Sequence, residues 1–368
     1  MRPATDIHAL IDRVENGSAD IDDVAALLDS DAEADIVPLY ERAYAAKRRS
    51  VGNCVYFRAL IEFSNRCGKN CLYCGIRSGM TELDRYTLGE ADIMRMAHWA
   101  DEARYGSLVL QSGERHDPEF VAMVERVVQR IKAETKLGIT LSIGEQTRQT
   151  YARWRSAGAH RYLLRIETSN PELYRSLHPA DHSFADRLAC LNSLRATGYQ
   201  VGTGVMIGLP GQSLEDLARD IFFFRDMDVD MIGMGPYIPH AGTPLGQAAP
   251  PIPDVARRLR LTLNMIAVTR LMLPDLNIAA TTALQALAPR GREFGLQVGA
   301  NVIMPNVTDT EYRDGYQLYD NKPCRDENAG QCRSCLERRI ASVGETIGYD
   351  EWGDAPHARR RLTEGAPT

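Results

Sequence analysis

The sequence predicts an α/β protein whose main domain is a (β/α)8 TIM barrel. Between about residues 51 and 310, short β-prone runs alternate with amphipathic helical segments. This alternation is typical of a parallel sheet with helical crossovers, and eight repeats are enough to close a barrel. A length of 368 residues fits one such barrel with an extension at each end. The expected strands are 56–64, 107–111, 138–143, 161–167, 200–207, 230–235, 277–282 and 301–304.

Two extensions flank the predicted barrel. Residues 1–50 read as acidic helices with apolar positions at helical spacing, and we expect this N-terminal helical extension to pack as a cap on the barrel. Residues 311–368 form a C-terminal segment with a second group of cysteines and a short helix. The arginine run 359–361 lies in a polar tail, where we predict a solvated end.

Composition excludes several classes of protein. Lys plus Arg is 43 and Asp plus Glu is 49, so the formal charge of −6 gives no field for nucleic acid. We also expect no membrane span and no secretory leader. Six of the eight cysteines fall into two clusters, as in metal sites of a reducing compartment, so we expect a cytoplasmic protein. The isolated Cys54 and Cys190 are expected to be buried apolar residues.

Alternation along the strands predicts a polar barrel lumen. The outer face of a barrel strand packs on helices, so apolar residues should point outward and their neighbours inward. In the first strand the apolar face consists of Phe57, Ala59, Ile61 and Phe63. Arg58 and Glu62 then point into the lumen, as do Arg165 and Glu167 of the fourth strand. Either the lumen holds a charged ligand, or these residues form an ion-pair network that braces the strands.

Three cysteines follow the first strand with the spacing C-x3-C-x2-C: Cys67, Cys71 and Cys74. They would supply three thiolates to a 4Fe–4S cluster, whereas an electron-transfer cluster normally has four cysteines. One iron is then left open. In this arrangement S-adenosylmethionine (SAM) usually binds the open iron through its amino and carboxylate groups. The spacing therefore predicts a radical-SAM enzyme.

Two segments at strand C-termini suit the same cofactor, because barrel enzymes carry their chemistry at that end. Residues 111–114, QSGE, end the second strand, and their glycine allows close approach of a ligand. Residues 204–212 end the fifth strand in a Gly/Pro turn before a capped helix. Tyr73, beside Cys74, is placed to stack near the adenine of SAM; the alternative is a loop anchor against the barrel rim.

A second group, Cys324, Cys332 and Cys335, has the spacing C-x7-C-x2-C. Three soft ligands this close indicate an auxiliary iron–sulfur cluster, with zinc as the main rival. The group can serve either as a structural staple or as a part of the catalytic machinery.

These motifs together resemble the HydE family of radical-SAM maturases of FeFe-hydrogenase, within the wider biotin synthase and methylornithine synthase group. The resemblance runs from about Arg49 to Trp352. One departure stands at Gly211, where the wider superfamily often has an acidic residue, so SAM contacts at this strand stay open. The matching segments are 58–77, 109–114, 161–171, 208–212, 235–240, 280–283, 301–306 and the late cysteines.

The resemblance implies reductive cleavage of SAM to a 5′-deoxyadenosyl radical. The substrate would be a cysteine-bound Fe(CO)2(CN) precursor of the two-iron subcluster, with its carboxylate held by Arg58 and the threonines. Partners would be an electron donor such as a ferredoxin or flavodoxin, and other hydrogenase maturases. Matching the SAM site are Tyr73, Gln111, Ser112, Glu167, Arg187 and Met206. Matching the substrate cavity are Arg58, Thr281, Thr282, Met304, Tyr316 and Tyr319.

Three alternatives remain at this point. The first is a radical-SAM reaction on an amino acid, such as methylornithine formation, because the cavity residues suit any α-amino acid. The second is an electron carrier or cluster scaffold without radical chemistry, which the open iron disfavours. The third is a zinc protein without any cluster.

Overall fold

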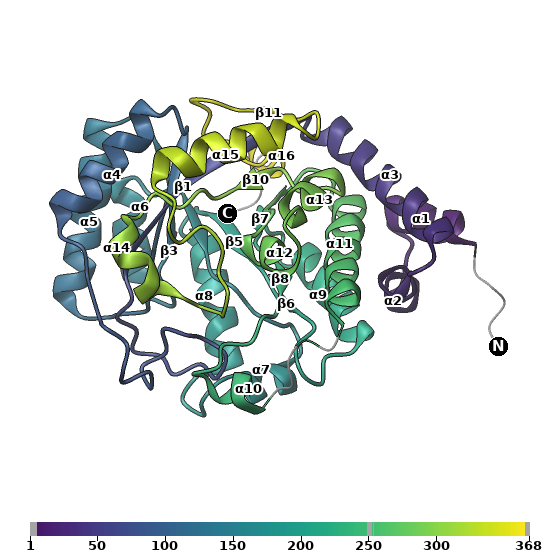
Figure 1. The fold of residues 1–368 in the computed structure, drawn as a ribbon, viewed down its shortest axis with the longest axis horizontal. Helices are drawn as coiled ribbons and strands as arrows, with labels where there is room; N and C mark the ends of the chain where they lie inside the picture. Colours follow the sequence, from purple (N-terminus) through teal and green to yellow (C-terminus); the bar gives the residue numbers. More distant parts are fainter. Residues whose placement is uncertain (1–5, 249–251, 253, 365–368) are drawn as a thin grey trace.

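A computed structural model of the chain describes residues 6–248, 252 and 254–364, and it is built around a barrel of parallel strands with helices outside (Figure 1). The strand order is β10-β1-β2-β3-β4-β5-β7-β9, and a bridge between Ala279 and Val302 joins the two ends of this sheet. The predicted eight-stranded α/β barrel is therefore confirmed. Its strands are β1 (Cys54–Ser64), β2 (Ser107–Ser112), β3 (Gly138–Ser142), β4 (Arg161–Leu163), β5 (Gln200–Thr203) with β6 (Met206–Ile207), β7 (Met231–Ile232) with β8 (Gly235–Pro236), β9 (Asn277–Ile278) and β10 (Val302–Ile303).

The fifth and sixth barrel strands differ from the prediction because each is broken by a glycine. A Cβ on Gly204 would lie 2.1 Å from the carbonyl oxygen of Gly233, so the two backbones pass too closely for any side chain. Beyond these glycines, β6 and β8 pair with each other as a separate short sheet. The chain thus forms a second, two-stranded sheet beyond the C-terminal ends of β5 and β7, on the side where the SAM site was predicted.

Outward-facing residues of the strands pack on the crossover helices as predicted. Phe63 of β1 stacks on Phe120 of α5 with ring centroids 5.8 Å apart. Arg58 and Glu62 are buried on the opposite face. The helices around the barrel are α4 (Glu90–Glu102), α5 (Pro118–Glu134), α6 (Arg148–Ala157), α7 (Pro171–Leu177), α8 (Phe184–Ala196), α9 (Leu214–Asp226), α10 (Pro244–Ala248), α11 (Val255–Met272), α12 (Thr282–Leu287) and α13 (Gly291–Gln297).

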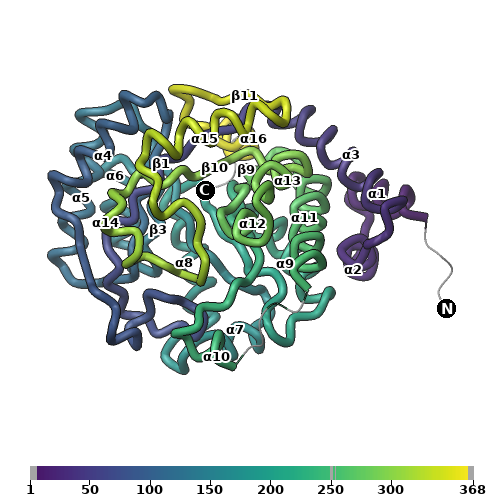
Figure 2. Tube along the Cα trace, in the orientation of Figure 1, coloured from purple at the N-terminus to yellow at the C-terminus, as the bar shows by residue number. Residues whose placement is uncertain are grey.

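The N-terminal helices form the expected cap at one side of the barrel (Figure 2). They are α1 (Ile7–Glu15), α2 (Ile21–Asp29) and α3 (Glu33–Ser50). Helix α3 packs along α11, and α2 packs against α9. Among the described residues no helix has the length and apolar character needed to cross a bilayer.

The C-terminal segment returns to the barrel instead of ending as a solvated tail. Strand β11 pairs in parallel with the start of β1. In the last helix Arg361 forms ion pairs with Asp228 and Asp230, and Arg360 pairs with Asp275. Arg359 and Arg360 nevertheless stay exposed, so only Arg361 departs from the predicted solvated end. The elements are α14 (Thr310–Arg313), the 3-10 turn η1 (Asp314–Tyr316), α15 (Ala329–Ala341), β11 (Thr346–Ile347) and α16 (Pro356–Glu364).

The chain between β11 and α16 closes the N-terminal end of the barrel. There the carbonyl oxygen of Gly353 accepts hydrogen bonds from Arg58 (3.2 Å) and Asn277 (2.8 Å). The next residue, Asp354, pairs with Arg161 at 2.6 Å. Arg161 and Asn277 are the first residues of their strands, and Arg58 is level with Ser107, the first residue of β2, so this segment is the floor of the lumen.

The two isolated cysteines are not buried as expected. Cys54 and Cys190 are both partly exposed. Cys54 lies at the start of β1, beside the backbone of Gly348 that follows β11, and Cys190 donates its thiol hydrogen toward the carbonyl oxygen of Gln146. Cys54 is the first residue of β1, whereas Cys190 lies in the middle of α8 and packs against the core with part of its surface exposed.

We predict that Asp354→Ala lowers the unfolding free energy by about 3 kcal/mol, because it leaves the fully buried Arg161 without its carboxylate. Asp12→Ala is the control: its pair with Arg42 is 60% and 43% exposed, so the loss should stay below about 1 kcal/mol. Thermal or chemical unfolding of the two variants measures the difference. If both variants lose the same unfolding free energy, the ion pair of Asp354 with Arg161 does not stabilise the floor of the barrel.

Candidate active site

The first three clustered cysteines lie in an irregular loop, residues 65–89, between β1 and α4. Arg85 organises this loop from inside. Its Nη1 donates to the carbonyl oxygens of Asn65 (2.6 Å) and Ile76 (2.8 Å), and its Nη2 donates to two more carbonyls of the loop. One guanidinium therefore satisfies backbone acceptors that regular secondary structure would otherwise pair.

The loop rests directly on the C-terminal end of β2. The backbone N–H of Glu114 donates to the sulfur of Cys67 at 3.3 Å, and the N–H of Gly68 donates to the carbonyl oxygen of Glu114 at 2.8 Å. A Cβ on Gly113 would lie 2.6 Å from the Cβ of Cys67 and 2.5 Å from the carbonyl oxygen of Arg66. Only glycine at this position allows the approach, as the QSGE motif suggested.

The three thiols lie close enough to influence one another. Burial raises the pKa of Cys71 to about 12, against the opposing charge of Arg187. Burial also raises the pKa of Cys74, and the charges of Cys71 and Cys67 raise it further. Without a metal the thiols are therefore neutral, and a cluster would replace their protons.

A charged network surrounds the cysteines, and the sequence analysis found only part of it. Lys69 lies between Glu114 (3.5 Å) and Glu145 (3.3 Å). Arg187, a predicted SAM residue, donates from Nε to Glu145 at 2.7 Å. Glu145 lies three residues beyond the end of β3, and Glu114 lies two residues beyond the end of β2; this position after a strand was the available signal.

Glu167 and Tyr73 also lie near the cysteines: after burial, the charge of Glu167 helps raise the pKa of Cys71, and the charges of Glu167 and Cys71 help raise the pKa of Tyr73. The expected strand 161–167 is shorter in the structure, because β4 ends at Leu163, and Glu167 beyond it has φ 66°. Arg165, predicted to point inward, pairs with Glu167 at 2.9 Å. The hydroxyl of Tyr73 lies 3.3 Å from Nε2 of His178.

An apolar cluster adjoins Tyr73 beside the bend at Gly204. Tyr73 packs against this cluster, which contains Met206, another predicted SAM residue. Aromatic and aliphatic walls of this kind suit a nucleobase. The buried members are Leu173, Leu177, Met206, Leu209 and Tyr237.

Gln111 and Ser112 end β2 on the edge between the cysteine loop and the lumen. The side chain of Gln111 lies near Tyr316, a predicted substrate residue, and lowers the pKa of its hydroxyl against the larger effect of burial. Ser112 donates its hydroxyl to the carbonyl oxygen of Gly113 at 2.8 Å. These two predicted SAM residues thus link the cysteine loop to the lumen.

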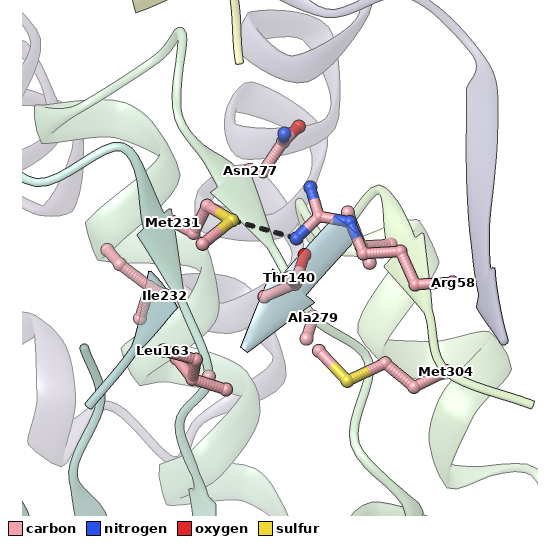
Figure 3. A pocket seen from close by; sticks show the side chains of 10 residues that line it. Arg58, Thr140, Leu163, Met231, Ile232, Asn277, Ala279 and Met304 are labelled. Carbon is pink, nitrogen blue, oxygen red and sulfur yellow. Dashed lines mark hydrogen bonds between the residues drawn. The ribbon is translucent and has the colours of Figure 1, made fainter. Parts of the chain in front are cut away.

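Arg58 lies on the floor of the lumen (Figure 3). Its Nη1 donates to the sulfur of Met231 at 2.8 Å, and its Nη2 donates to the carbonyl oxygen of Gly353 in the floor. Burial, followed by the charge of Arg161, lowers the pKa of Arg58, although Asp354 opposes this. The cavity beside Arg58, which Met304 also lines, has room for about one water molecule.

The other predicted substrate residues lie higher in the lumen. The hydroxyl of Thr282 is 2.8 Å from that of Tyr319. The hydroxyl of Thr281 is buried and has no hydrogen-bond partner among the described residues. A buried hydroxyl without a partner is costly, so it is a candidate contact for a ligand.

Sequence analysis missed Lys322, which reaches the lumen from the segment before Cys324. Its Nζ lies 2.5 Å from Oε1 of Glu62, the residue of β1 predicted to point inward. Lys322 stands in an irregular segment without any periodic pattern, so no sequence signal marked it.

The second cysteine group also converges. Cys332 and Cys335 lie three residues apart on α15, hence on one face of the helix. Cys324, with φ 64°, receives a hydrogen bond from Nη2 of Arg292 at 3.2 Å. The hydrogen bond with Cys332 lowers the pKa of Cys324, and the charge of Arg292 acts in the same direction, while burial opposes both.

The donor set around the first three cysteines fits a 4Fe–4S cluster with SAM. It combines three neighbouring thiols, an N–H···S hydrogen bond and a glycine whose Cβ would block the loop. Across residues 6–248, 252 and 254–364, no three His, Cys, Asp or Glu side chains converge tightly enough for a single metal ion. A cluster spaces its cysteines more widely than a single ion does.

The radical SAM superfamily model matches residues 61–224. The FeFe hydrogenase maturase subunit HydE of Thermotoga maritima is 45% identical over 89% of this chain and 90% of its own length. The chain belongs to the HydE family. It is a radical-SAM enzyme of the hydrogenase-maturase type, a class that uses a 4Fe–4S cluster and SAM.

This HydE-type chain is also similar to methylornithine synthases. The 3-methylornithine synthase of Methanosarcina acetivorans is 28% identical over 81% of this chain and 83% of its own length. A crystal structure of methylornithine synthase (PylB) superposes with a TM-score of 0.79 at 25% identity, covering 93% of this chain and 98% of that one.

We predict that Gly113→Ala impairs assembly of the cluster, because its Cβ would collide with backbone and with Cys67. Iron content and visible absorption after anaerobic reconstitution should fall to less than about half of wild type, since the loop must move off β2. Gly68→Ala is a matched control in the same loop, with its nearest contact at 3.5 Å. Normal iron content in Gly113→Ala would contradict the contact described here.

Proposed function

We propose that this protein applies radical-SAM chemistry to a cysteine-bound Fe(CO)2(CN) precursor, on the way to the two-iron subcluster of FeFe-hydrogenase. The observation that carries the proposal is that the cysteine loop and the barrel lumen adjoin each other. The loop with the three cysteines and the lumen with Tyr316 meet at Gln111. A radical formed at the loop would therefore face a ligand in the lumen.

Cys67, Cys71 and Cys74 would hold the cluster. When bound, a reduced 4Fe–4S cluster with SAM supplies a 5′-deoxyadenosyl radical and methionine. Around them, Arg187 and Glu167 offer charges to the amino acid part and ribose of SAM, and Gln111 and Ser112 offer hydrogen bonds. Tyr73 and Met206 would enclose the adenine, since both belong to the apolar cluster beside Gly204.

The lumen would hold the substrate. Arg58 donates to a sulfur and a carbonyl, neither of which neutralises its charge, so it would attract the anionic iron complex from the floor. The unpaired hydroxyl of Thr281 would donate to the substrate directly. The walls would be formed by Thr282, Met304, Tyr316 and Tyr319.

Cys324, Cys332 and Cys335 would bind an auxiliary iron–sulfur cluster. The positive charge of Arg292 beside Cys324 would stabilise thiolate ligands of either iron–sulfur or zinc. Elemental analysis of a Cys67→Ala, Cys71→Ala, Cys74→Ala triple variant separates the two metals, because only the second group then remains.

As partners we propose a low-potential electron donor, such as a ferredoxin or flavodoxin, and the other hydrogenase maturases. The six clustered thiols, all free, favour a reducing, cytoplasmic setting. The deciding experiment is activation of apo-hydrogenase by the purified protein together with the other maturases. Failure to activate, with SAM cleavage intact, would refute the maturase function.

A second candidate is a radical-SAM reaction on a free amino acid. The similarity to methylornithine synthase over most of both chains favours it. Lysine supplied as the only substrate, with product analysis by mass spectrometry, distinguishes this candidate from the maturase.

We predict that Cys71→Ala abolishes the release of 5′-deoxyadenosine from SAM under reducing conditions, because two thiolates would be left for the cluster. Chromatography of the nucleoside products measures this. Cys54→Ala is the matched control, since Cys54 lies at the start of β1 beside the chain that follows β11. Wild-type turnover in Cys71→Ala would refute the assigned cluster site.

We also predict that Thr281→Val weakens binding of the organometallic substrate by about 1 kcal/mol, roughly fivefold in KM, because it removes one neutral donor. Stability should not fall, since the hydroxyl has no partner in the described chain. Thr262→Val, on α11, is the control and should leave KM unchanged. An unchanged KM in Thr281→Val would exclude the contact.

A further inference from the structure

The segment of residues 314–324, here named the strap, crosses the mouth of the barrel between α14 and α15 (Figure 1). It touches the cysteine loop, because the N–H of Gly75 donates to the carbonyl oxygen of Leu318 at 3.1 Å. A Cβ on Gly75 would overlap the carbonyl oxygen of Gln317. The strap therefore connects the two cysteine groups, since it contacts the loop of the first group at Gly75 and ends at Cys324 of the second.

One ion pair joins the strap to the interior of the lumen. Nζ of Lys322 lies 2.5 Å from Oε1 of Glu62, and their side chains are 10% and 1% exposed. Lys322 also donates to the carbonyl oxygen of Tyr316 at 3.0 Å. The second oxygen of Glu62 accepts from the amide of Asn306 at 2.8 Å.

The two partners differ in how firmly they are held. The backbone N–H of Glu62 donates to Thr308 and its carbonyl oxygen accepts from Tyr86, both at 2.8 Å, so Glu62 is fixed on β1. Lys322 lies in a segment without regular secondary structure, and its ammonium is carried by a flexible four-carbon side chain. Its ammonium can therefore move while the carboxylate stays.

Closing the mouth of the barrel does not by itself require a buried ion pair. Two charges lose their hydration, and apolar residues of similar size often close a buried site as well. Such a pair suits a site that binds a ligand with both a positive and a negative group. Each residue of the pair can then replace its partner by the oppositely charged group of the ligand, so neither charge is left unpaired. The pair also lies beside Tyr316, a proposed wall of the substrate cavity.

We propose that Lys322 and Glu62 form the seat for the zwitterionic amino acid group of the substrate. Lys322 contacts the carboxylate and Glu62 contacts the ammonium, so the four charges alternate. This inference rests on the proposed function and deepens it. It assigns the substrate carboxylate to the mouth of the lumen, above the floor where Arg58 already has two acceptors.

The test measures binding without turnover, by equilibrium dialysis of the reconstituted enzyme in the absence of reductant. The probes are S-methyl-L-cysteine, its decarboxylated relative 2-(methylthio)ethylamine, and its deaminated relative 3-(methylthio)propionate. Thioethers avoid direct attack of a thiol on the cluster. Wild type should prefer the zwitterion over both relatives.

Lys322→Met should bind the two carboxylate probes about tenfold more weakly and leave the amine probe nearly unchanged, the scale of one charge-assisted contact. Glu62→Gln should show the mirror pattern, with weaker binding of the two amine-bearing probes. Lys136→Met is the matched control. Lys136 is exposed and distant in sequence from both Glu62 and Lys322, so this variant should bind all three probes as wild type does.

Equal changes for all three probes in either variant would overturn the inference, because a simple strut does not recognise charge. If a single variant fails to fold, the neutral double variant Lys322→Met, Glu62→Gln takes its place and should show no preference. A wild-type preference in the double variant would also overturn it. If the wild-type protein prefers the zwitterionic probe but does not activate apo-hydrogenase, the proposed maturase function is refuted and the inference about Lys322 and Glu62 is not.

Discussion

The close contact between the cysteine loop and the end of β2 is the constraint on which the rest of this site depends. Gly113 lets the backbone of the loop lie against the strand, and the N–H of Glu114 then reaches the sulfur of Cys67. Arg85 holds the loop in shape from the other side. Because this contact fixes the thiols relative to the barrel, it also fixes which lumen residues a radical would face.

The lumen is closed at both ends by the C-terminal segment. Gly353 and Asp354 seal the floor through Arg58 and Arg161, while the strap covers the mouth through Lys322. The two closures use the same physical device, a buried cation that reaches a polar group of another element. A radical enzyme gains from such closures, because water and stray hydrogen donors are kept away from the reactive centre.

Much of the fold followed from local patterns, and the failures have identifiable causes. Period-two alternation in β1 predicted correctly that Arg58 and Glu62 face inward, because one face of a barrel strand must pack on helices. The strand predicted at 200–207 is broken instead, since Gly204 meets Gly233 of the neighbouring strand. Arg361 of α16 was expected in solvent, but Asp228 and Asp230, distant in sequence, pair with it.

The sequence by itself determined the cysteine spacing, the barrel and the inward charges, because these depend on neighbours along the chain. Only the tertiary structure decided that Arg58 lies on a closed floor and that Lys322 meets Glu62. These contacts join residues separated by hundreds of positions: Arg58 to Gly353, and Glu62 to Lys322. Such pairings are set by where the chain returns to the barrel, which no local periodicity encodes.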